Sequence, residues 1–172
     1  MHLSTTEFDL RLRAETAADD DAIRSICEEA FGPGRFARAA ERVREMVSHA
    51  PAYSFVAESG GALVGSVRLT PVAVGGRPVL MLGPLAVRPA FKGRGAGRGL
   101  MALAEDAARK AGEALIFLVG DRAYYMPLGY RPVPPGAIVM PGPVDPARIL
   151  ALPLNDSALE GLAGEVSRRA GV

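Results

Sequence analysis

Residues 82–111 read LGPLAVRPAFKGRGAGRGLMALAEDAARKA and decide the fold. An apolar run leads into a loop in which every second residue from position 93 to position 99 is glycine. Apolar residues then recur at helical spacing from Leu100 to Ala108, so the loop lies at the N-terminus of a helix. The first turn of a helix leaves backbone N–H groups unpaired and carries partial positive charge. We therefore interpret the stretch as a pyrophosphate cradle, because glycine lets a phosphate approach the main chain closely.

Two familiar nucleotide-binding loops do not fit this spacing. A dinucleotide-binding G-x-G-x-x-G motif that begins at Gly93 needs glycine at position 98, which is Arg98. A Walker loop needs Gly-Lys-Ser or Gly-Lys-Thr, and neither tripeptide occurs. Both nucleotide-binding interpretations are therefore disfavoured.

Two segments carry a family resemblance. LAVRPAFKGRGAGRGLM, residues 85–101, resembles the acetyl-CoA motif of the GNAT superfamily of N-acetyltransferases, Gln/Arg-x-x-Gly-x-Gly/Ala, which Lys92, Gly95 and Gly97 match. GDRAYYMPLGY, residues 120–130, resembles the second motif of that superfamily, particularly in its YhbS-like branch, where a tyrosine stands four residues before a Gly-aromatic pair.

The resemblance implies a fold. We expect one GNAT N-acetyltransferase domain over residues 1–172, of α/β (α+β) class, with a mixed, mostly antiparallel sheet of about seven strands. A splayed parallel pair of strands and flanking helices complete this expectation. The length of 172 residues independently favours a single domain.

Charge and composition narrow the function classes. The net charge of +1 argues against bulk electrostatic binding to nucleic acid or to a membrane surface. The single cysteine, Cys27, excludes an internal disulfide, and we interpret it as a core residue rather than a nucleophile. The first residues lack the apolar core of a signal peptide, and no apolar run is long enough to span a membrane, so we expect a cytoplasmic protein.

Periodicity places the remaining elements. The predicted strands are residues 8–13, 53–58, 62–74, 79–87, 115–119, 137–140 and 148–154. Helices are predicted from the cap candidates Thr16 and Asp19 to the residue before Gly32, over residues 35–48, after the Gly-rich loop, and from Asn155 through Leu159, Leu162 and Val166.

The strand before the Gly-rich loop and the apolar run at residues 115–119 are joined by one helix. Such a crossover is right-handed and makes the two strands parallel. Ligands bind outside the carboxyl ends of parallel strands, which here are Val87 and Gly120. The loop and the second motif are therefore expected to converge on one site.

The resemblance also implies roles for individual residues. The cofactor is acetyl-CoA, as co-substrate, with no metal. Oxyanion stabilisation is implied for the backbone at a bulge near Pro84, since proline breaks the strand ladder. The implied cofactor-binding residues are Leu85, Ala86, Val87, Lys92, Gly93, Arg94, Gly95, Ala96, Gly97, Arg98, Asp121 and Tyr124.

Tyr125 matches the tyrosine of the second motif and is the candidate general acid. A phenol with a pKa of about 10 can protonate a thiolate with a pKa of about 8.5. Tyr124 is the alternative acid, and a structural role for both tyrosines stays open. No residue is named as the base, because Glu28, Glu29 and Glu58 are as readily explained as surface charges. We interpret His49 as a surface residue or a helix cap.

Three positions depart from the family pattern. Lys92 replaces the usual Gln or Arg, Asp121 replaces an asparagine that holds the pantetheine arm, and Pro127 shortens the helix that carries the tyrosines.

Two hypotheses follow. The first is an N-acetyltransferase that moves acetyl from acetyl-CoA to a primary amine of a small molecule or peptide by direct attack in a ternary complex. The second is a non-catalytic acyl-CoA-binding module of the same fold. Arginines at positions 35, 38 and 42 hint at an anionic acceptor, although a solvated helix face is the commoner explanation for such residues. The last two predicted strands offer an edge for a homodimer.

Overall fold

The computed structural model describes residues 9–34 and 38–172. The strands are β1 (Leu10–Ala14), β2 (Phe55–Ser59), β3 (Ala62–Val74), β4 (Arg77–Val87), β5 (Leu115–Val119), β6 (Arg131–Pro132), β7 (Ile138–Val139), β8 (Ile149–Pro153) and β9 (Gly164–Arg168). The α-helices are α1 (Asp20–Phe31), α2 (Ala39–Met46), α3 (Ala96–Lys110) and α4 (Arg122–Tyr125). The sheet runs in the order β1-β2-β3-β4-β5-β8-β6, while β9 pairs with β3 and β7 with β9. This mixed, mostly antiparallel sheet with flanking helices confirms the predicted fold class.

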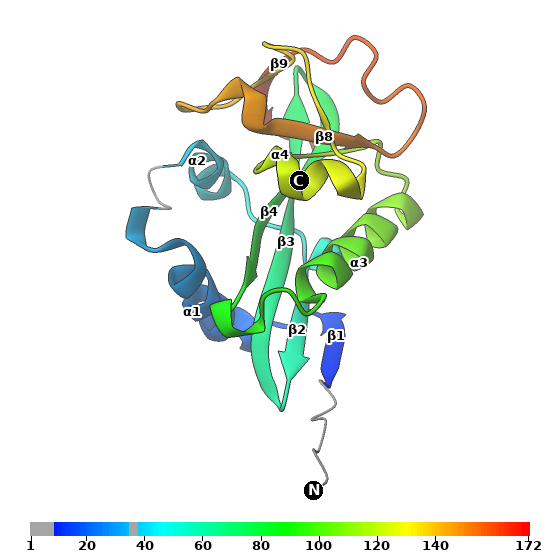
Figure 1. Ribbon diagram of the computed structural model, residues 1–172. Coiled ribbons are helices and arrows are strands. Elements are labelled where there is room, and N and C mark those ends of the chain that lie inside the picture. The colour runs from blue at the N-terminus through cyan, green and yellow to red at the C-terminus, as the bar shows by residue number, and fades with distance from the viewer. Residues whose placement is uncertain (1–8, 35–37) are drawn as a thin grey trace, which may run out of the picture.

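Helices cover both sides of the long strands β3 and β4. In Figure 1, α1 and α2 lie on one side of these strands and α3 on the other. Ile23, Ile26 and Cys27 are buried on α1, as their helical spacing predicts. Leu100 and Ala104 of α3 are buried in the same way, in a cluster that includes side chains of β2, β3 and β4. The amphipathic patterns of the two helices therefore fix which faces meet the sheet.

Strands β4 and β5 are parallel, as predicted for two strands joined by one helix. They pair at Leu80 with Ile116 and at Met81 with Phe117, and nowhere else in the described part of the chain. Both strands continue past these pairs, so they separate toward their carboxyl ends. The result is an opening in the middle of the sheet.

A β-bulge in β4 marks the point where this strand leaves β5. Leu82 of β4 pairs with Leu69 of β3. The next pair joins Leu85 to Val67, so two residues of β4 stand opposite one residue of β3. One of the two is Pro84, which has no N–H to donate to a ladder. The break in regular pairing that Pro84 predicts is therefore present.

The predicted C-terminal helix is wrong. Residues 154–163 form turns, and β9 follows, pairing antiparallel with β3 and parallel with β7. Asn155 accepts a hydrogen bond from the Ser157 N–H (3.2 Å), which closes a turn rather than capping a helix. Gly161 and Gly164 both have positive φ, which a helix does not allow, and Val166 is buried as a strand residue. Pairing with the exposed edge of β3 outweighs the helical spacing of the apolar residues.

The other strands and helices differ less from those predicted from the sequence. The sheet has nine strands rather than about seven, because β6 and β9 were not predicted, while β7 lies within the predicted strand 137–140. In the predicted helix 35–48, the described part is helical only over α2, and residues 35–37 lie outside the described residues. Phe8, at the start of the first predicted strand, also lies outside them.

No helix in residues 9–34 and 38–172 is both long enough and apolar enough to cross a membrane.

The turn between β3 and β4 tests the placement of β9. Gly75 and Gly76 both have positive φ, at +54° and +81°. A Cβ at Gly75 would lie 2.1 Å from the carbonyl oxygen of Ala163, whereas one at Gly76 would meet nothing within 4 Å. We expect Gly76→Ala to lower the free energy of unfolding by about 1–2 kcal/mol through backbone strain alone. Gly75→Ala should cost about 1–3 kcal/mol more, because the methyl group also displaces the segment before β9.

Urea denaturation of the two variants, with the wild type as reference, measures this difference. Equal costs for the two substitutions would contradict the position of β9 against this turn.

Candidate active site

The Gly-rich loop leads into α3 with its backbone donors facing outward. Gly95 precedes the helix with a φ of +89°, and the first helical hydrogen bond runs from the Gly99 N–H to the Gly95 carbonyl (2.9 Å). The N–H groups of residues 96–98 therefore have no carbonyl partner inside the helix. A cavity of about 710 Å³ lies in front of them. Its lining is formed by Leu85, Val87, Phe91, Lys92, Gly93, Gly95, Ala96, Gly97, Arg98, Tyr124 and Tyr125.

Gly97 is the position in this cavity where a side chain has least room. A Cβ there would lie 2.8 Å from the hydroxyl oxygen of Tyr124. Only glycine leaves the tyrosine hydroxyl beside the first turn of α3 without displacing it. Lys92 and Arg98 add two cations to the same lining. Open main-chain N–H groups, a narrow glycine and two cations fit a pyrophosphate-bearing coenzyme.

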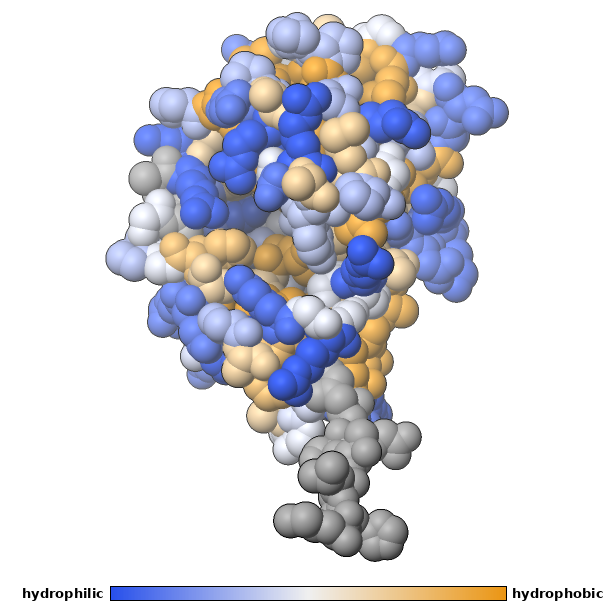
Figure 2. Space-filling view, in the orientation of Figure 1, coloured by the Kyte–Doolittle hydropathy of each residue, from blue (hydrophilic) through white to orange (hydrophobic). Residues whose placement is uncertain are grey.

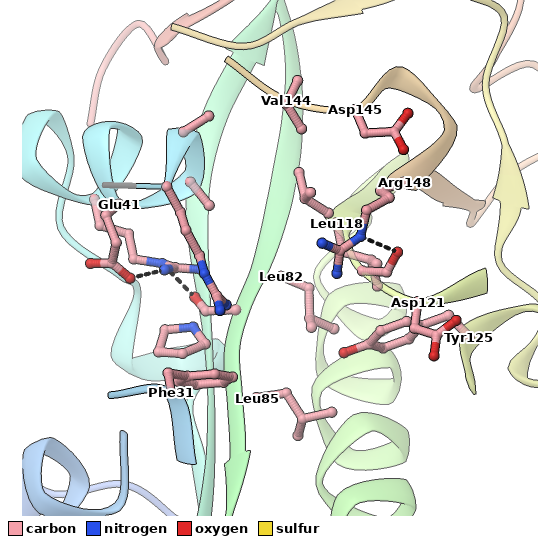
Figure 3. A pocket seen from close by; sticks show the side chains of 18 of the residues that line it. Phe31, Glu41, Leu82, Leu85, Leu118, Asp121, Tyr125, Val144, Asp145 and Arg148 are labelled. Atoms are coloured by element: carbon pink, nitrogen blue, oxygen red, sulfur yellow. Dashed lines mark hydrogen bonds and ion pairs between the residues drawn. The ribbon is translucent and has the colours of Figure 1, made fainter. Parts of the chain in front are cut away.

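A second cavity, of about 490 Å³, lies between α2 and the segment that leads into β8. Figure 3 shows Phe31 and Glu41 on one wall, and Leu118, Tyr125 and Arg148 on the other. In the space-filling view, a hollow opens in a rim of hydrophilic residues with hydrophobic side chains inside it (Figure 2).

The two cavities share part of their walls. Leu85, Tyr124 and Tyr125 line both of them. Leu85 follows the bulge of β4, and the tyrosines lie on α4, directly after β5. The shared wall is thus at the opening where β4 and β5 separate. A molecule in one cavity can meet a molecule in the other at this point.

Tyr125 is held by packing, since no hydrogen bond to its hydroxyl is formed within residues 9–34 and 38–172. Its ring lies so close to Gly120 that a Cβ at that position would be 2.4 Å from a ring carbon. The rings of Tyr124 and Tyr130 contact it edge-on, at centroid distances of 4.8 Å and 5.9 Å. Burial raises the pKa of Tyr125 to about 12, and the nearby Arg148 guanidinium opposes this rise.

Two further tyrosines flank Tyr125 with different environments. Tyr124 is 42% exposed. Partial burial raises its pKa, and the charge of Arg98 opposes this rise. Tyr130 is fully buried, and its hydroxyl donates to the Glu105 carboxylate (3.2 Å). Burial raises the pKa of Tyr130 and that of Glu105. The ring of Tyr130, held by this hydrogen bond, packs against the ring of Tyr125.

Three charged groups of the second cavity were not singled out as site residues from the sequence. Glu41 is paired with Arg44, whose Nε donates to the carbonyl of Gly83 (3.1 Å), and burial lowers the pKa of Arg44. Arg148 donates from its Nε to the carbonyl of Gly120 (3.3 Å). These residues come from α2 and from the start of β8, far apart in the chain, so no local motif could have indicated them.

Most of the predicted coenzyme residues line the 710 Å³ cavity, but three do not. Ala86 is buried and lines neither cavity. Arg94 lies with its guanidinium over the ring of Phe91, at 5.6 Å from the centroid. Asp121 lines the second cavity, and its Oδ1 accepts the N–H of Ala123 (2.9 Å), which caps α4.

The carboxylates considered as bases lie elsewhere. Glu29 pairs with Arg88 (2.5 Å) and Glu58 with Arg13 (2.7 Å), while Glu28 is exposed. None of the three lines either cavity.

A third cavity, of about 420 Å³, lies between α1, α2 and the sheet. Cys27 and His49, which we assigned to structural roles, line it. Cys27 is buried among apolar side chains that include Ile23 and Ile26, which confirms it as a core residue. His49 lies with its Nε2 3.2 Å from an oxygen of Glu15.

Comparison with known proteins identifies the family. A sequence profile described as the acetyltransferase (GNAT) family matches residues 20–130. Over 119 residues the chain is 31% identical to YjhQ of Escherichia coli K12, which is described as an uncharacterized N-acetyltransferase. The aligned region covers 67% of this chain and 66% of YjhQ, slightly less than two thirds of that relative. The chain belongs to the GNAT family.

Solved structures of other GNAT proteins share the fold. YhbS of Escherichia coli, in a structure described as a complex with CoA, is 24% identical and superposes with a TM-score of 0.79 over 98% of this GNAT chain and 94% of its own. A GNAT acetyltransferase of Brucella melitensis, described as a complex with acetyl-CoA, is 26% identical with a TM-score of 0.68, over 94% and 97% of the two chains. The predicted family is therefore confirmed, and the fold neighbours include coenzyme complexes.

Proposed function

We propose that this GNAT protein is an acetyl-CoA-dependent N-acetyltransferase. It moves the acetyl group to a primary amine by direct attack within a ternary complex. The observation that carries this proposal is the wall shared by the two cavities, at Leu85, Tyr124 and Tyr125. The coenzyme occupies the 710 Å³ cavity and the small-molecule or peptide amine the 490 Å³ cavity. Because the two meet directly, no covalent relay through the protein is needed.

The first turn of α3 binds the coenzyme. The N–H groups of residues 96–98 donate to pyrophosphate oxygens, and Lys92 and Arg98 supply positive charge. The complexes of YhbS with CoA and of the Brucella protein with acetyl-CoA support this assignment. Arg94 and Ala86 do not line the cavity, so we give them no direct contact with the coenzyme.

The opened strand β4 supplies main-chain donors to the reacting thioester. Beyond Met81, β4 has no ladder partner on its β5 side in the described part of the chain. The Arg88 N–H donates to the carbonyl of Val64 on β3. Backbone groups of a strand alternate in direction, so the N–H groups of Leu85 and Val87 face this opening while that of Ala86 faces β3. A donor in such a position stabilises the negative charge that develops on the carbonyl oxygen during attack.

Tyr125 protonates the leaving thiolate. Its hydroxyl belongs to the wall that both cavities share, and its raised pKa keeps it protonated at neutral pH. In water the thiol has a pKa of about 8.5, below that of Tyr125, so the transfer requires that desolvation at the shared wall also raises the basicity of the departing sulfur as the C–S bond breaks. Tyr124, closer to Gly97, lies at the coenzyme side instead.

The cradle is tested by adding one charge in two places on the same helix. Gly97→Glu puts a carboxylate among the phosphate donors and against Tyr124, so we expect acetyl-CoA binding to be lost in calorimetric titration. Ala102→Glu adds the same charge on an exposed face of α3 and should bind as the wild type does. ATP and NAD should give no heat. Binding of a nucleotide instead of acetyl-CoA would overturn the assignment.

The acid is tested by removing single hydroxyl groups. We expect Tyr125→Phe to lower kcat by about 100-fold while the affinity for acetyl-CoA is unchanged, because only the departing thiolate needs the proton. Tyr124→Phe is the matched control and should lower kcat far less. Unchanged turnover in Tyr125→Phe would remove the acid role, and absence of turnover in the wild type with any amine would favour the acyl-CoA-binding module.

The high pKa of Tyr125 predicts the shape of the pH profile. A peptide α-amine has a pKa of about 8, so its reactive neutral form is nearly complete above about pH 9. A tyrosine with an ordinary pKa of about 10 would then lose its proton and the rate would fall from there. Since the Tyr125 pKa is raised to about 12, we expect kcat/KM to rise to a plateau that persists beyond about pH 10. A falling limb centred near pH 10 that is absent in Tyr125→Phe would contradict this.

A further inference from the structure

Arg148 occupies a distinctive place in the second cavity. It ends the 3₁₀ turn Pro146–Arg148 and stands directly before β8, which pairs with β5. Its Nε donates to the carbonyl of Gly120, and its own carbonyl accepts the N–H of Gly120 (2.9 Å). These two bonds fasten Arg148 to the carboxyl end of β5. Figure 3 shows its guanidinium on the same wall as Tyr125 and opposite Glu41.

The other charged groups of this cavity each make at least one contact. The guanidinium of Arg38 lies over the Phe31 ring, at 5.4 Å from its centroid. Glu41 and Arg44 pair with each other on the α2 wall. Asp121 and Asp145 each accept a backbone N–H at the start of a helical turn, at 2.9 Å. Arg148, like Arg38, forms no ion pair with any carboxylate in the described part of the chain, but it is the arginine fastened to the end of β5. Its two terminal nitrogens remain available to an anion.

The space between these walls is apolar. Leu82 and Leu118 form its floor where β4 and β5 separate, and Phe31, Pro84 and Val144 complete the lining. A volume of about 490 Å³ is in the range of small-molecule sites rather than of extended macromolecular grooves. The cavity therefore suits a small ligand that combines an aliphatic part with one anionic group.

We propose that the acceptor is an amino acid with an apolar side chain and that Arg148 binds its carboxylate. This inference rests on the proposed acetyl transfer and specifies its acceptor class. The planar guanidinium matches a carboxylate with two parallel hydrogen bonds. Because Arg148 lies beside Tyr125, a carboxylate held there brings the neighbouring α-amine to the wall that the cavities share. The aliphatic side chain lies against the leucines between β4 and β5.

A polyamine is the opposing acceptor class. Its second cation would need a carboxylate that is not yet bound. Glu41 is paired with Arg44, and Asp121 and Asp145 are exposed and hold backbone N–H groups. Arg148 is exposed as well, but its bonds to Gly120 hold it at the end of β5 on the same wall as Tyr125 (Figure 3), and this position favours an anionic acceptor.

The test is calorimetric titration of CoA-saturated protein with leucine, leucinamide and spermidine, which requires no turnover. Leucinamide keeps the amine and the side chain of leucine but lacks its carboxylate. We expect the wild type to bind leucine more tightly than either other amine. Arg148→Gln should weaken leucine binding by about 10–100-fold, as for loss of a charged hydrogen-bonded pair. Arg148→Lys keeps the charge without the planar guanidinium, so its affinity for leucine should lie between those of the wild type and Arg148→Gln.

Arg168→Gln is the matched control. Arg168 is an exposed arginine on β9 that lines neither cavity, so its loss should leave leucine binding as in the wild type. Acetyl-CoA affinity, measured for each variant, reports whether the Arg148 substitutions damage the site as a whole.

Three results would overturn the proposal: leucinamide or spermidine binding at least as tightly as leucine, no detectable leucine binding, or equal leucine affinity in Arg148→Gln and the wild type. Amine acetylation by a wild type that fails these binding tests would reject the acceptor class and leave the proposed function standing. Leucine binding through Arg148 without any acetyl transfer would reject the proposed function and leave the binding role of Arg148 standing.

Discussion

The early end of the pairing between β4 and β5 is the constraint on which the site depends. Two adjacent strands that paired over their full length would close the sheet and separate its two sides. Here the ladder stops after Met81 and Phe117, and the bulge at Pro84 turns β4 away from β5. Main-chain donors and a passage through the sheet result from the same break. The two cavities meet in that passage, so the chemistry requires a sheet that is locally incomplete.

The elements around the opening contribute main-chain groups on one side and side chains on the other. On the proposed coenzyme side, the loop before α3 presents backbone N–H groups. A ligand can approach them because the loop contains glycine, not because of a particular side chain. On the acceptor side, α2 and the segment before β8 contribute charged side chains, of which Arg148 is fastened to β5 by two hydrogen bonds. Tyr125 lies between the two sides, held by ring packing. The proposed coenzyme contacts thus depend on backbone geometry, and the proposed acceptor contacts depend on side chains that a related chain can change.

Residues that carry local information were predicted well. The loop from Gly93 to Arg98, the crossover from β4 to β5 and the break at Pro84 each follow from adjacent residues. Tyr125 was singled out by its spacing from Gly129, and the structure places it on the wall that both cavities share. The C-terminal segment was not predicted, because its apolar spacing suits a helix while the free edge of β3 offers a strand partner. Such an edge is invisible in the sequence of the segment itself.

The sequence by itself determined the family, the order of the main elements and the Gly-rich loop that opens α3, because glycine spacing and amphipathic periodicity act over a few residues. Only the tertiary structure decided the acceptor side. Glu41 and Arg44 lie about a hundred residues before Arg148 in the chain, and all three line one cavity because β8 pairs with β5 while α2 packs on the other side of the opening. Their place in one cavity is a property of long-range pairing and packing, for which no local pattern exists.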